Sequence, residues 1–280
     1  FWYKKAAESG YAQSQNNYAY MYHEGIGVSQ NYSMAAKWYE KAAKQGNSYS
    51  QYNLSSLYFY GYGIPKNMKL SFAWSLKSAK QGYASAQARI GYMYRSGTGV
   101  TKDLKLGYSW LKKAAKQKNA SAENQLGYLF EYGYGVNKNQ ETAVLWYKKA
   151  AKQGYMLGQY NLANHYSSGK GVEKSLTKAF YWFGKAAKKN DAISQYRYAK
   201  IFAIGLGTDK NFVKAHYWLK QASKKSYGPA MYQLARSYQY SLGTDKNLSK
   251  AYFWYKKAAN AGVKKAKEKV DKWQKISSDK

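Results

Sequence analysis

The residue types that most often carry enzyme chemistry are few in this 280-residue chain and form no recognisable set. There is no cysteine, which excludes disulfides, thiolate metal sites and cysteine nucleophiles. The three histidines, His23, His165 and His216, stand far apart and never at the spacing of a metal-binding motif. His216 takes a place that aromatic residues fill elsewhere in the chain, so we expect it to be packed. We expect His23 and His165 to be surface residues rather than metal ligands.

The fourteen carboxylates are scattered along the chain, and several of them lie beside lysines. General acid–base catalysis needs two such groups in one cleft, and the sequence offers no convincing pair. A nucleophile elbow and a Walker phosphate loop are also missing from the sequence. We therefore predict a protein that is not an enzyme and that requires no cofactor and no metal.

The composition points to a folded and strongly basic protein. Lysine and arginine number 46 against 14 acidic residues, which gives a formal net charge of +32. Aromatic residues make up 18% of the chain, far more than a disordered chain carries. No apolar run reaches about 18 residues, so we predict no transmembrane segment. A charge of this size favours anionic partners.

Two residue types recur with one constant period, and this repeat determines the fold. Tryptophan returns every 36 residues, at Trp2, Trp38, Trp74, Trp110, Trp146, Trp182, Trp218 and Trp254. Glycine returns with the same period, at Gly27, Gly63, Gly99, Gly135, Gly171, Gly207 and Gly243. Two registers with one period predict an array of equivalent structural units.

Each unit is predicted to hold two helices. Small and aromatic residues four apart give the first helix a buried stripe, and a paired-glycine turn follows it. We interpret this turn as a hinge rather than a phosphate loop, because it recurs at one position of every unit. The second helix is predicted to begin at a capping side chain, and its apolar face then follows at helical spacing. The predicted caps are Asn31, Asn67, Asp103, Asn139, Ser175, Asn211 and Asn247.

These units resemble the Sel1-like repeat family, which is related to tetratricopeptide repeats. The segment Trp38-Tyr39-Glu40-Lys41-Ala42-Ala43-Lys44-Gln45-Gly46 resembles the family's second helix, and Gln159-Tyr160-Asn161-Leu162-Ala163 resembles its first helix. The resemblance implies an all-α fold, a right-handed superhelical solenoid of 36-residue helix-turn-helix repeats. It also implies an adaptor role, in bacteria often exported or periplasmic rather than cytoplasmic, with some members serving virulence and some resembling immunity proteins. Non-glycine residues replace the family's glycines at Lys118, Asn190, Ser226 and Ser241.

The repeat register predicts how the chain is divided. Residues 1–10 are the second helix of a truncated repeat, and residues 263–280 form a C-terminal capping helix that contains Trp273. Because the chain begins inside a helical hairpin, we expect ordered sequence to precede Phe1 in the full-length protein. The seven full repeats cover 11–46, 47–82, 83–118, 119–154, 155–190, 191–226 and 227–262.

One face of the first helices is rich in tyrosine, and we predict that it is a concave groove that binds a protein. Tyrosine supplies a large contact area at low entropy cost, while asparagine adapts its hydrogen bonds to the partner. An alternative is that tyrosines at the position of Tyr52 and Tyr160 pack between repeats. The predicted partner-binding residues are Tyr20, Tyr52, Tyr60, Tyr92, Tyr128, Tyr132, Tyr160, Asn164, Tyr196, Lys200, Tyr232, Arg236 and Tyr240.

Lysines gather at the end of every second helix and predict a positive ridge along the array. The partner that we predict is therefore an acidic protein. An anionic envelope polymer, such as peptidoglycan or lipopolysaccharide, bound by the ridge is the alternative. Specific nucleic-acid recognition is not expected, because base reading favours arginine and the chain has only four.

Overall fold

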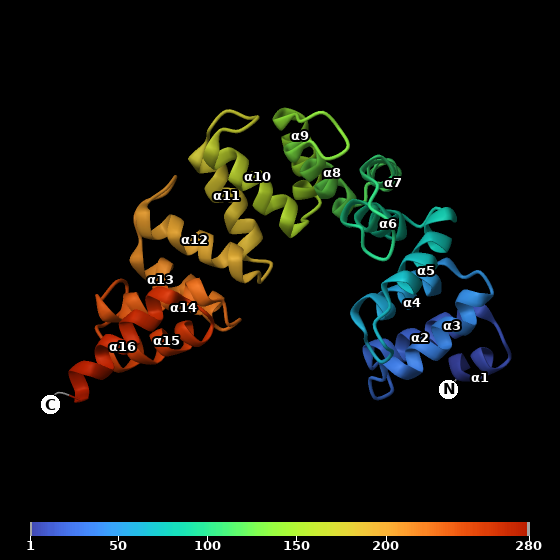
Figure 1. Cartoon of the computed structure of the whole chain (residues 1–280), viewed down its shortest axis with the longest axis horizontal. Helices are drawn as coiled ribbons and strands as arrows, with labels where there is room; N and C mark the ends of the chain where they lie inside the picture. The colour runs from blue at the N-terminus through green and yellow to red at the C-terminus, as the bar shows by residue number, and fades with distance from the viewer. Residues whose placement is uncertain (1, 279–280) are drawn as a thin grey trace. The chain divides into compact units, whose positions relative to one another are not determined.

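The computed structural model describes residues 2–278, and over this range every element is a helix (Figure 1). Residue 1 of the truncated repeat and residues 279–280 of the predicted cap lie outside the described residues. In chain order the helices are α1 (Trp2–Glu8), α2 (Ala12–Glu24), α3 (Tyr32–Lys44), α4 (Ser48–Tyr60), α5 (Met68–Lys80), α6 (Ala84–Ser96), α7 (Leu104–Lys116), α8 (Ala120–Tyr132), α9 (Gln140–Lys152), α10 (Met156–Ser168), α11 (Leu176–Ala187), α12 (Ala192–Ile204), α13 (Phe212–Ser223), α14 (Gly228–Gln239), α15 (Leu248–Asn260) and α16 (Lys264–Ser278).

The helices form two compact units, Phe1–Trp146 and Tyr147–Lys280, here called the N-terminal and C-terminal units. Within each unit the helices pack in chain order, so that α2 contacts α3, α3 contacts α4, and so on. The even-numbered helices from α2 to α14 are the first helices of the repeats, and the odd-numbered helices from α3 to α15 are the second helices. The first helices α6 and α8 also touch each other directly. This arrangement confirms the all-α repeat solenoid.

The second helices begin where the sequence predicts, because each predicted capping side chain accepts a hydrogen bond from a backbone N–H three residues later. Asn31 Oδ1 accepts from the Met34 N–H at 3.0 Å, and Asp103 Oδ1 accepts from the Leu106 N–H at 2.8 Å. Such a cap contributes about 1 kcal/mol to helix stability. The same bond is made by Asn67, Asn139, Ser175, Asn211 and Asn247.

Four residues other than glycine adopt a left-handed backbone, and they are the four that replace glycines of the repeat pattern. Their φ values are +59° for Lys118, +64° for Asn190, +56° for Ser226 and +56° for Ser241. The glycines equivalent to the first three, such as Gly46 at +93°, have no atom close to the place where a side chain would begin, whereas at Gly61, equivalent to Ser241, the nearest atom would lie 3.2 Å away. The repeat geometry therefore imposes this conformation whichever residue occupies the position.

The paired-glycine turn brings neighbouring repeats together. A Cβ atom added to Gly99 would overlap the backbone carbonyl of Met68, where the second helix of the preceding repeat begins. A Cβ at Gly135 would lie 2.7 Å from the carbonyl oxygen of Leu104, at the equivalent place one repeat later. The turn thus serves as the predicted hinge, and its second glycine lets two backbones approach closely.

The core consists of alanine, leucine and tyrosine from both helices of each repeat. Tyr39, Tyr147 and Tyr255 occupy the same repeat position and are fully buried. Burial raises the pKa of Tyr39 and of Tyr255 above the ordinary value of a tyrosine. At the C-terminal end, the ring of Trp273 stacks on Tyr252 with the ring centroids 5.7 Å apart, so α16 covers the last repeat.

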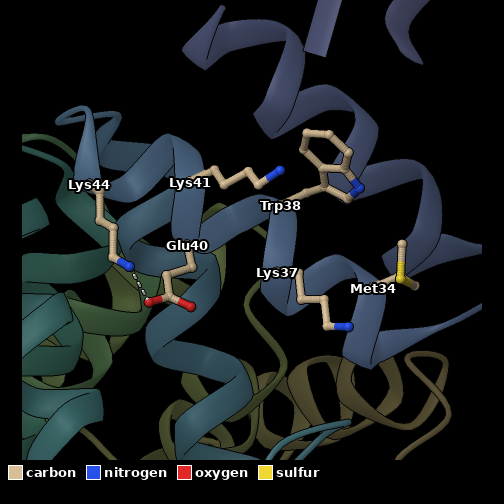
Figure 2. A pocket seen from close by; sticks show the side chains of 6 residues that line it. All are labelled: Met34, Lys37, Trp38, Glu40, Lys41 and Lys44. Atoms are coloured by element: carbon tan, nitrogen blue, oxygen red, sulfur yellow. Dashed lines mark ion pairs between the residues drawn. The ribbon is translucent and has the colours of Figure 1, made fainter. Parts of the chain in front are cut away.

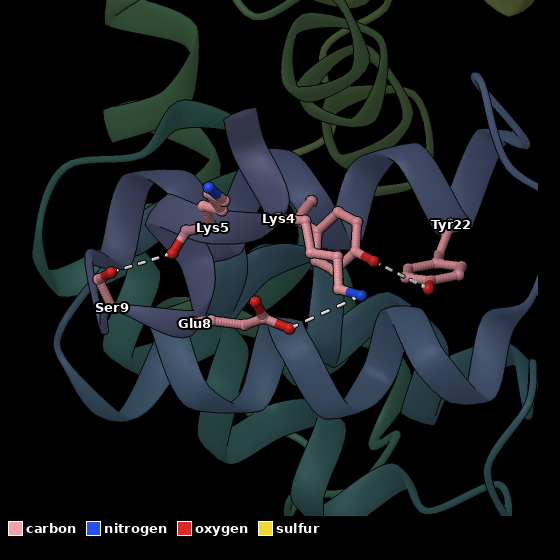
Figure 3. Close-up of polar contacts among 6 residues, drawn as sticks. Lys4, Lys5, Glu8, Ser9 and Tyr22 are labelled. Carbon is pink, nitrogen blue, oxygen red and sulfur yellow. Dashed lines mark hydrogen bonds and ion pairs between the residues drawn. The ribbon is translucent and has the colours of Figure 1, made fainter. Parts of the chain in front are cut away.

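Three polar contacts lie within or next to the first two helices, α1 and α2 (Figure 3). Lys4 pairs with Glu8 on α1 at 3.9 Å, and the Ser9 hydroxyl donates to the Lys5 carbonyl at 3.0 Å. On α2 the hydroxyl oxygens of Tyr18 and Tyr22 lie 3.0 Å apart. This hydrogen bond, together with burial, raises the pKa of Tyr18 to about 12.

Candidate binding face

Two of the three histidines, His165 and His216, pack inside the repeats, while His23 is partly buried against the Tyr32 ring at 5.2 Å. His216 Nδ1 lies 2.8 Å from the Ser237 hydroxyl, and burial together with nearby Lys220 and Lys250 lowers the pKa of His216. His165 is 97% buried, so the prediction of a surface residue there is wrong. Its Nδ1 atom lies 2.7 Å from the Lys170 carbonyl oxygen. Among residues 2–278, no three histidine, aspartate or glutamate side chains lie close enough together to hold a metal ion.

His165 is buried because of its repeat position. The equivalent residues in the preceding repeats are Leu57, Met93 and Leu129, and all three are fully buried. The imidazole fills the same space beside the Tyr147 ring, with the ring centroids 5.4 Å apart. Its bond to a turn carbonyl satisfies the polar nitrogen that these apolar residues lack.

A shallow pocket of about 340 Å³ runs along α3 and carries no catalytic set (Figure 2). The Lys41 ammonium lies 4.1 Å from the centre of the Trp38 ring. The one carboxylate, Glu40, pairs with Lys44 at 2.7 Å. The remaining lining residues are Met34 and Lys37, so the pocket offers neither a nucleophile nor an acid–base pair.

A continuous chain of ring and guanidinium contacts links four repeats of the N-terminal unit. Tyr62 stacks on Tyr32 and on Tyr60, with ring centroids 5.2 and 5.3 Å apart. Phe59 then links Tyr60 to Tyr92 over 5.0 and 6.4 Å. We call this set, together with its continuation below, the tyrosine–arginine ladder: Tyr32, Phe59, Tyr60, Tyr62, Tyr92, Arg95, Tyr128, Tyr132 and Tyr134.

Arg95 joins the two halves of the ladder. Its guanidinium carbon lies 5.3 Å from the Tyr92 ring and 4.7 Å from the Tyr128 ring of the next repeat. Tyr128 contacts Tyr132 at 4.5 Å, and Tyr132 stacks on Tyr134 at 5.8 Å. Stacking of this kind holds the side chains in place before any partner binds.

The ladder has exposed tyrosines on either side of Arg95, whose guanidinium carries a positive charge. Tyr60 and Tyr132 expose 56% and 50% of their surfaces, and they occupy equivalent positions two repeats apart. Arg95 pairs with no carboxylate among residues 2–278, and its Nε atom is buried without a hydrogen-bond partner. Burial, the charge of Glu131 and a hydrogen bond to that carboxylate raise the pKa of Tyr132.

A second arginine of α6 extends this surface. Arg89 donates to the hydroxyls of Ser55 and Ser56 at 2.8 and 2.7 Å, and it lies 4.2 Å from the Tyr52 ring centre. These partners are neutral, and no carboxylate within residues 2–278 pairs with Arg89.

Four of the predicted residues pack between helices rather than standing free. Tyr52, Tyr160, Tyr196 and Tyr232 share one repeat position and are partly buried. Tyr52 meets Tyr83 at 5.2 Å, and Tyr196 meets Tyr227 at 5.5 Å, each time at the start of the next repeat. Tyr160 and Tyr232 pack on the second-helix residues Phe183 and Tyr255, at 5.8 and 5.5 Å. Tyr52 and Tyr196 thus pack between repeats, as the alternative for this position predicts, whereas the partners of Tyr160 and Tyr232 belong to their own repeats.

The other predicted residues are dispersed. Tyr20 is 48% exposed and lies outside the ladder. In the C-terminal unit, Lys200 and Arg236 are exposed and lie 5.9 and 5.8 Å from the rings of Tyr196 and Tyr240. Asn164 is partly buried on α10. These contacts are separate pairs and do not form a second ladder.

Sequence reasoning missed Tyr32, Phe59, Tyr62, Arg95 and Tyr134 as members of this surface. A signal for two of them was present, because Tyr-Gly-Tyr-Gly occurs at 60–63 and again at 132–135. The turn tyrosines of these segments are the ones that stack on Tyr60 and Tyr132.

The fold defines a helical-repeat protein. The sequence model of the Sel1 repeat matches residues 1–11, 12–47, 48–83, 84–119, 120–155, 157–191, 192–227 and 228–263, and the chain therefore belongs to the Sel1 repeat family. Proteins of this family are interaction scaffolds that bind other proteins and are generally non-catalytic. No helix within residues 2–278 has the length and apolarity to cross a membrane.

Three solved structures illustrate the relationship. The protein c5321 of uropathogenic Escherichia coli, a protective antigen, is 35% identical, with a TM-score of 0.72 over 96% of this chain and 58% of its own. This chain thus spans little more than half of that relative. A Sel1 repeat protein of Oxalobacter formigenes is 28% identical, with a TM-score of 0.76 over 97% and 78%. The immunity protein PA5088 of Pseudomonas aeruginosa shares the fold at 20% identity and a TM-score of 0.56 over 78% and 82%. No curated protein matches the chain.

Proposed function

We propose that this protein is a non-catalytic adaptor that binds an acidic segment of a partner protein along the tyrosine–arginine ladder. The observation that carries this proposal is Arg95, a partly buried guanidinium held between two tyrosine rings with no carboxylate partner in residues 2–278. A carboxylate of the partner completes the hydrogen bonds of this group, and a charge-assisted bond of that kind is about twice as strong as a neutral one.

The exposed tyrosines on either side supply the contact area. Tyr60 and Tyr132 are already stacked on Tyr62 and Tyr134, so little side-chain freedom is lost when a partner binds. The net charge of +32 accelerates the encounter with an acidic protein. The ladder then determines which partner is bound, and the lysines increase the rate at which that partner is encountered.

The biological setting that we propose is bacterial virulence or the neutralisation of a toxic effector. The 35% identical relative, a protective antigen of uropathogenic Escherichia coli, supports the first setting. The fold shared with immunity proteins of Pseudomonas aeruginosa is compatible with the second. An exported or periplasmic location fits both settings.

The experiment is affinity capture from a lysate of the source organism on the immobilised chain, with washes of rising salt. We expect one acidic protein to remain at high salt, and we expect Arg95→Gln and Tyr128→Ala to release it. Arg197→Gln is the matched control, because Arg197 is an exposed arginine of α12 outside the ladder. Retention by Arg95→Gln equal to that of the unchanged chain refutes the proposal.

The ridge of second-helix lysines supports a second candidate, an anionic envelope polymer such as peptidoglycan or lipopolysaccharide. In the N-terminal unit, Lys41, Lys77 and Lys113 lie 4.1 to 4.5 Å from the rings of the repeated tryptophans. A mixed set of partners that leaves together at low salt, whatever the state of Arg95, identifies this function instead.

A further inference from the structure

The second helices of the C-terminal unit carry a row of exposed aromatic side chains. Tyr181 on α11, Tyr217 on α13 and Phe253 on α15 lie 36 residues apart, at the same repeat position. Their exposed fractions are 53%, 54% and 50%. One turn before Tyr217, Val213 is 67% exposed on the same side of α13. Single exposed apolar residues are ordinary, but a row at one repeat position indicates a contact surface.

Each of these rings packs against a neighbouring tryptophan. Each meets the edge of the adjacent repeat tryptophan, with interplanar angles of 83° or 84° and ring centroids 5.1 to 5.3 Å apart. The tryptophans Trp182, Trp218 and Trp254 are themselves partly buried. The row is therefore held pointing outward rather than folded into the core.

Exposed lysines lie on both sides of the row, three residues before its aromatic residues and four residues after two of them. Lys178, Lys214 and Lys250 hold their ammonium groups 5.5 to 5.6 Å from the rings of Tyr166, Phe202 and Tyr238. On the other side, Lys185 and Lys257 lie 5.4 and 4.9 Å from Tyr181 and Phe253. The sequences of α11, α13 and α15 contain no aspartate or glutamate. We call Tyr181, Tyr217, Phe253, Lys178, Lys214 and Lys250 the aromatic–lysine face.

The fold does not require this face. In the N-terminal unit the positions equivalent to the aromatic row hold Phe1, Lys37, Ala73, Ser109 and Leu145, so three successive repeats with an aromatic residue at this position occur only in the C-terminal unit. These repeats have the same helices and caps, so packing alone does not explain the aromatic row. The difference between the units indicates a role that belongs to the C-terminal unit.

We propose that the aromatic–lysine face binds the surface of a lipid bilayer that contains anionic lipids. Aromatic rings favour the headgroup level of a membrane, where an apolar body meets water, and lysines beside them attract lipid phosphates. A nucleic-acid surface fits less well, because this face has no arginine to form bidentate bonds with phosphates or bases. The contact is peripheral, since residues 2–278 include no helix able to span a bilayer. The proposal goes beyond partner binding by the ladder, which lies on first helices, turns and the first residue of α3 in the other unit.

The test is sedimentation of the full chain with vesicles of phosphatidylcholine alone and of phosphatidylcholine mixed with phosphatidylserine. We expect binding only to the mixed vesicles. Tyr181→Ser, Tyr217→Ser and Phe253→Ser combined keep every charge, and we expect binding at least about tenfold weaker, since apolar area is lost from the contact. Lys178→Gln, Lys214→Gln and Lys250→Gln combined should weaken it by about 100-fold, because each lysine near an anionic surface changes binding about fivefold.

The control removes the same charge elsewhere. Lys66→Gln, Lys102→Gln and Lys138→Gln combined change three exposed lysines in turns of the N-terminal unit, and vesicle binding should stay within about threefold. Helix content and unfolding temperature show that each variant folds. As a second measurement, brominated lipids should quench tryptophan fluorescence in the unchanged chain and less in the serine variant.

Three results overturn the proposal. The first is no binding to the mixed vesicles. The second is equal loss from both lysine variants with no effect of the serine substitutions, which indicates general polyanion attraction. The third is binding of heparin or single-stranded DNA with the same dependence on the aromatic row. Arg95→Gln should leave vesicle binding unchanged. Failure of the membrane proposal is therefore distinguishable from failure of the proposal that the ladder binds a partner protein.

Discussion

The two glycines of the Gly97-Thr98-Gly99 turn have the same φ angle but different surroundings. Substituting each of them with alanine therefore separates the cost of a left-handed backbone from the cost of steric overlap. Both have a φ of +72°. At Gly97 the nearest atom to a new Cβ would be the Lys102 Cβ at 3.4 Å, an ordinary contact. At Gly99 the new Cβ would overlap the Met68 carbonyl group at the start of α5 in the preceding repeat.

The two substitutions should therefore differ in cost. A left-handed alanine costs about 1–2 kcal/mol, and the reduced freedom of the unfolded chain offsets about 0.4–1 kcal/mol. We expect Gly97→Ala to lower the free energy of unfolding by about 1 kcal/mol. Gly99→Ala adds overpacking against backbone, about 1–3 kcal/mol, so we expect a loss of about 3 kcal/mol in total.

Urea unfolding followed by helix circular dichroism measures this difference. Repeat arrays can unfold in segments, so hydrogen exchange of α5 and α6 amides should accompany it. We expect Gly99→Ala to lower the urea midpoint more than Gly97→Ala does. We also expect this variant to lose amide protection first in α5 and α6, where the two repeats meet. Equal losses from the two variants would refute the close-approach argument and leave only the left-handed backbone as the reason for both glycines.

Two further predictions concern stability. Lys118→Gly relieves a left-handed lysine (φ +59°) and should raise the free energy of unfolding by about 0.5–1 kcal/mol in a urea titration, whereas Lys116→Gly, within α7, should lower it. The lowered pKa of His216 means that the unfolded chain binds a proton more readily, so stability is full above pH 6.5 and falls below it. His216→Gln should flatten this fall in thermal melts between about pH 7.5 and about pH 5.5; an unchanged slope contradicts it.

Much of the fold could be predicted because its signals are local. A cap requires one side chain and a backbone N–H three residues away, so Asn31 and Asp103 can be identified without knowing the rest of the chain. A period of 36 in tryptophan and glycine then indicates stacked equivalent units, and the four interruptions of the glycine pattern coincide with the four left-handed residues of other types. Even the burial of His165 follows from this register, once its equivalents Leu57 and Leu129 are compared.

The binding surface could be predicted only in part, because it depends on side chains that meet across repeats. Tyr52 and Tyr60 lie on the same helix, yet Tyr52 is partly buried because the next repeat places Tyr83 against it, while Tyr60 remains exposed. Arg95 belongs to the ladder because Tyr128, 33 residues later, lies within 4.7 Å of its guanidinium. Helix periodicity determined which residues share a face of one helix. Which of them are covered, stacked or left open was decided by the neighbouring helix, since burial depends on atoms that are distant in sequence.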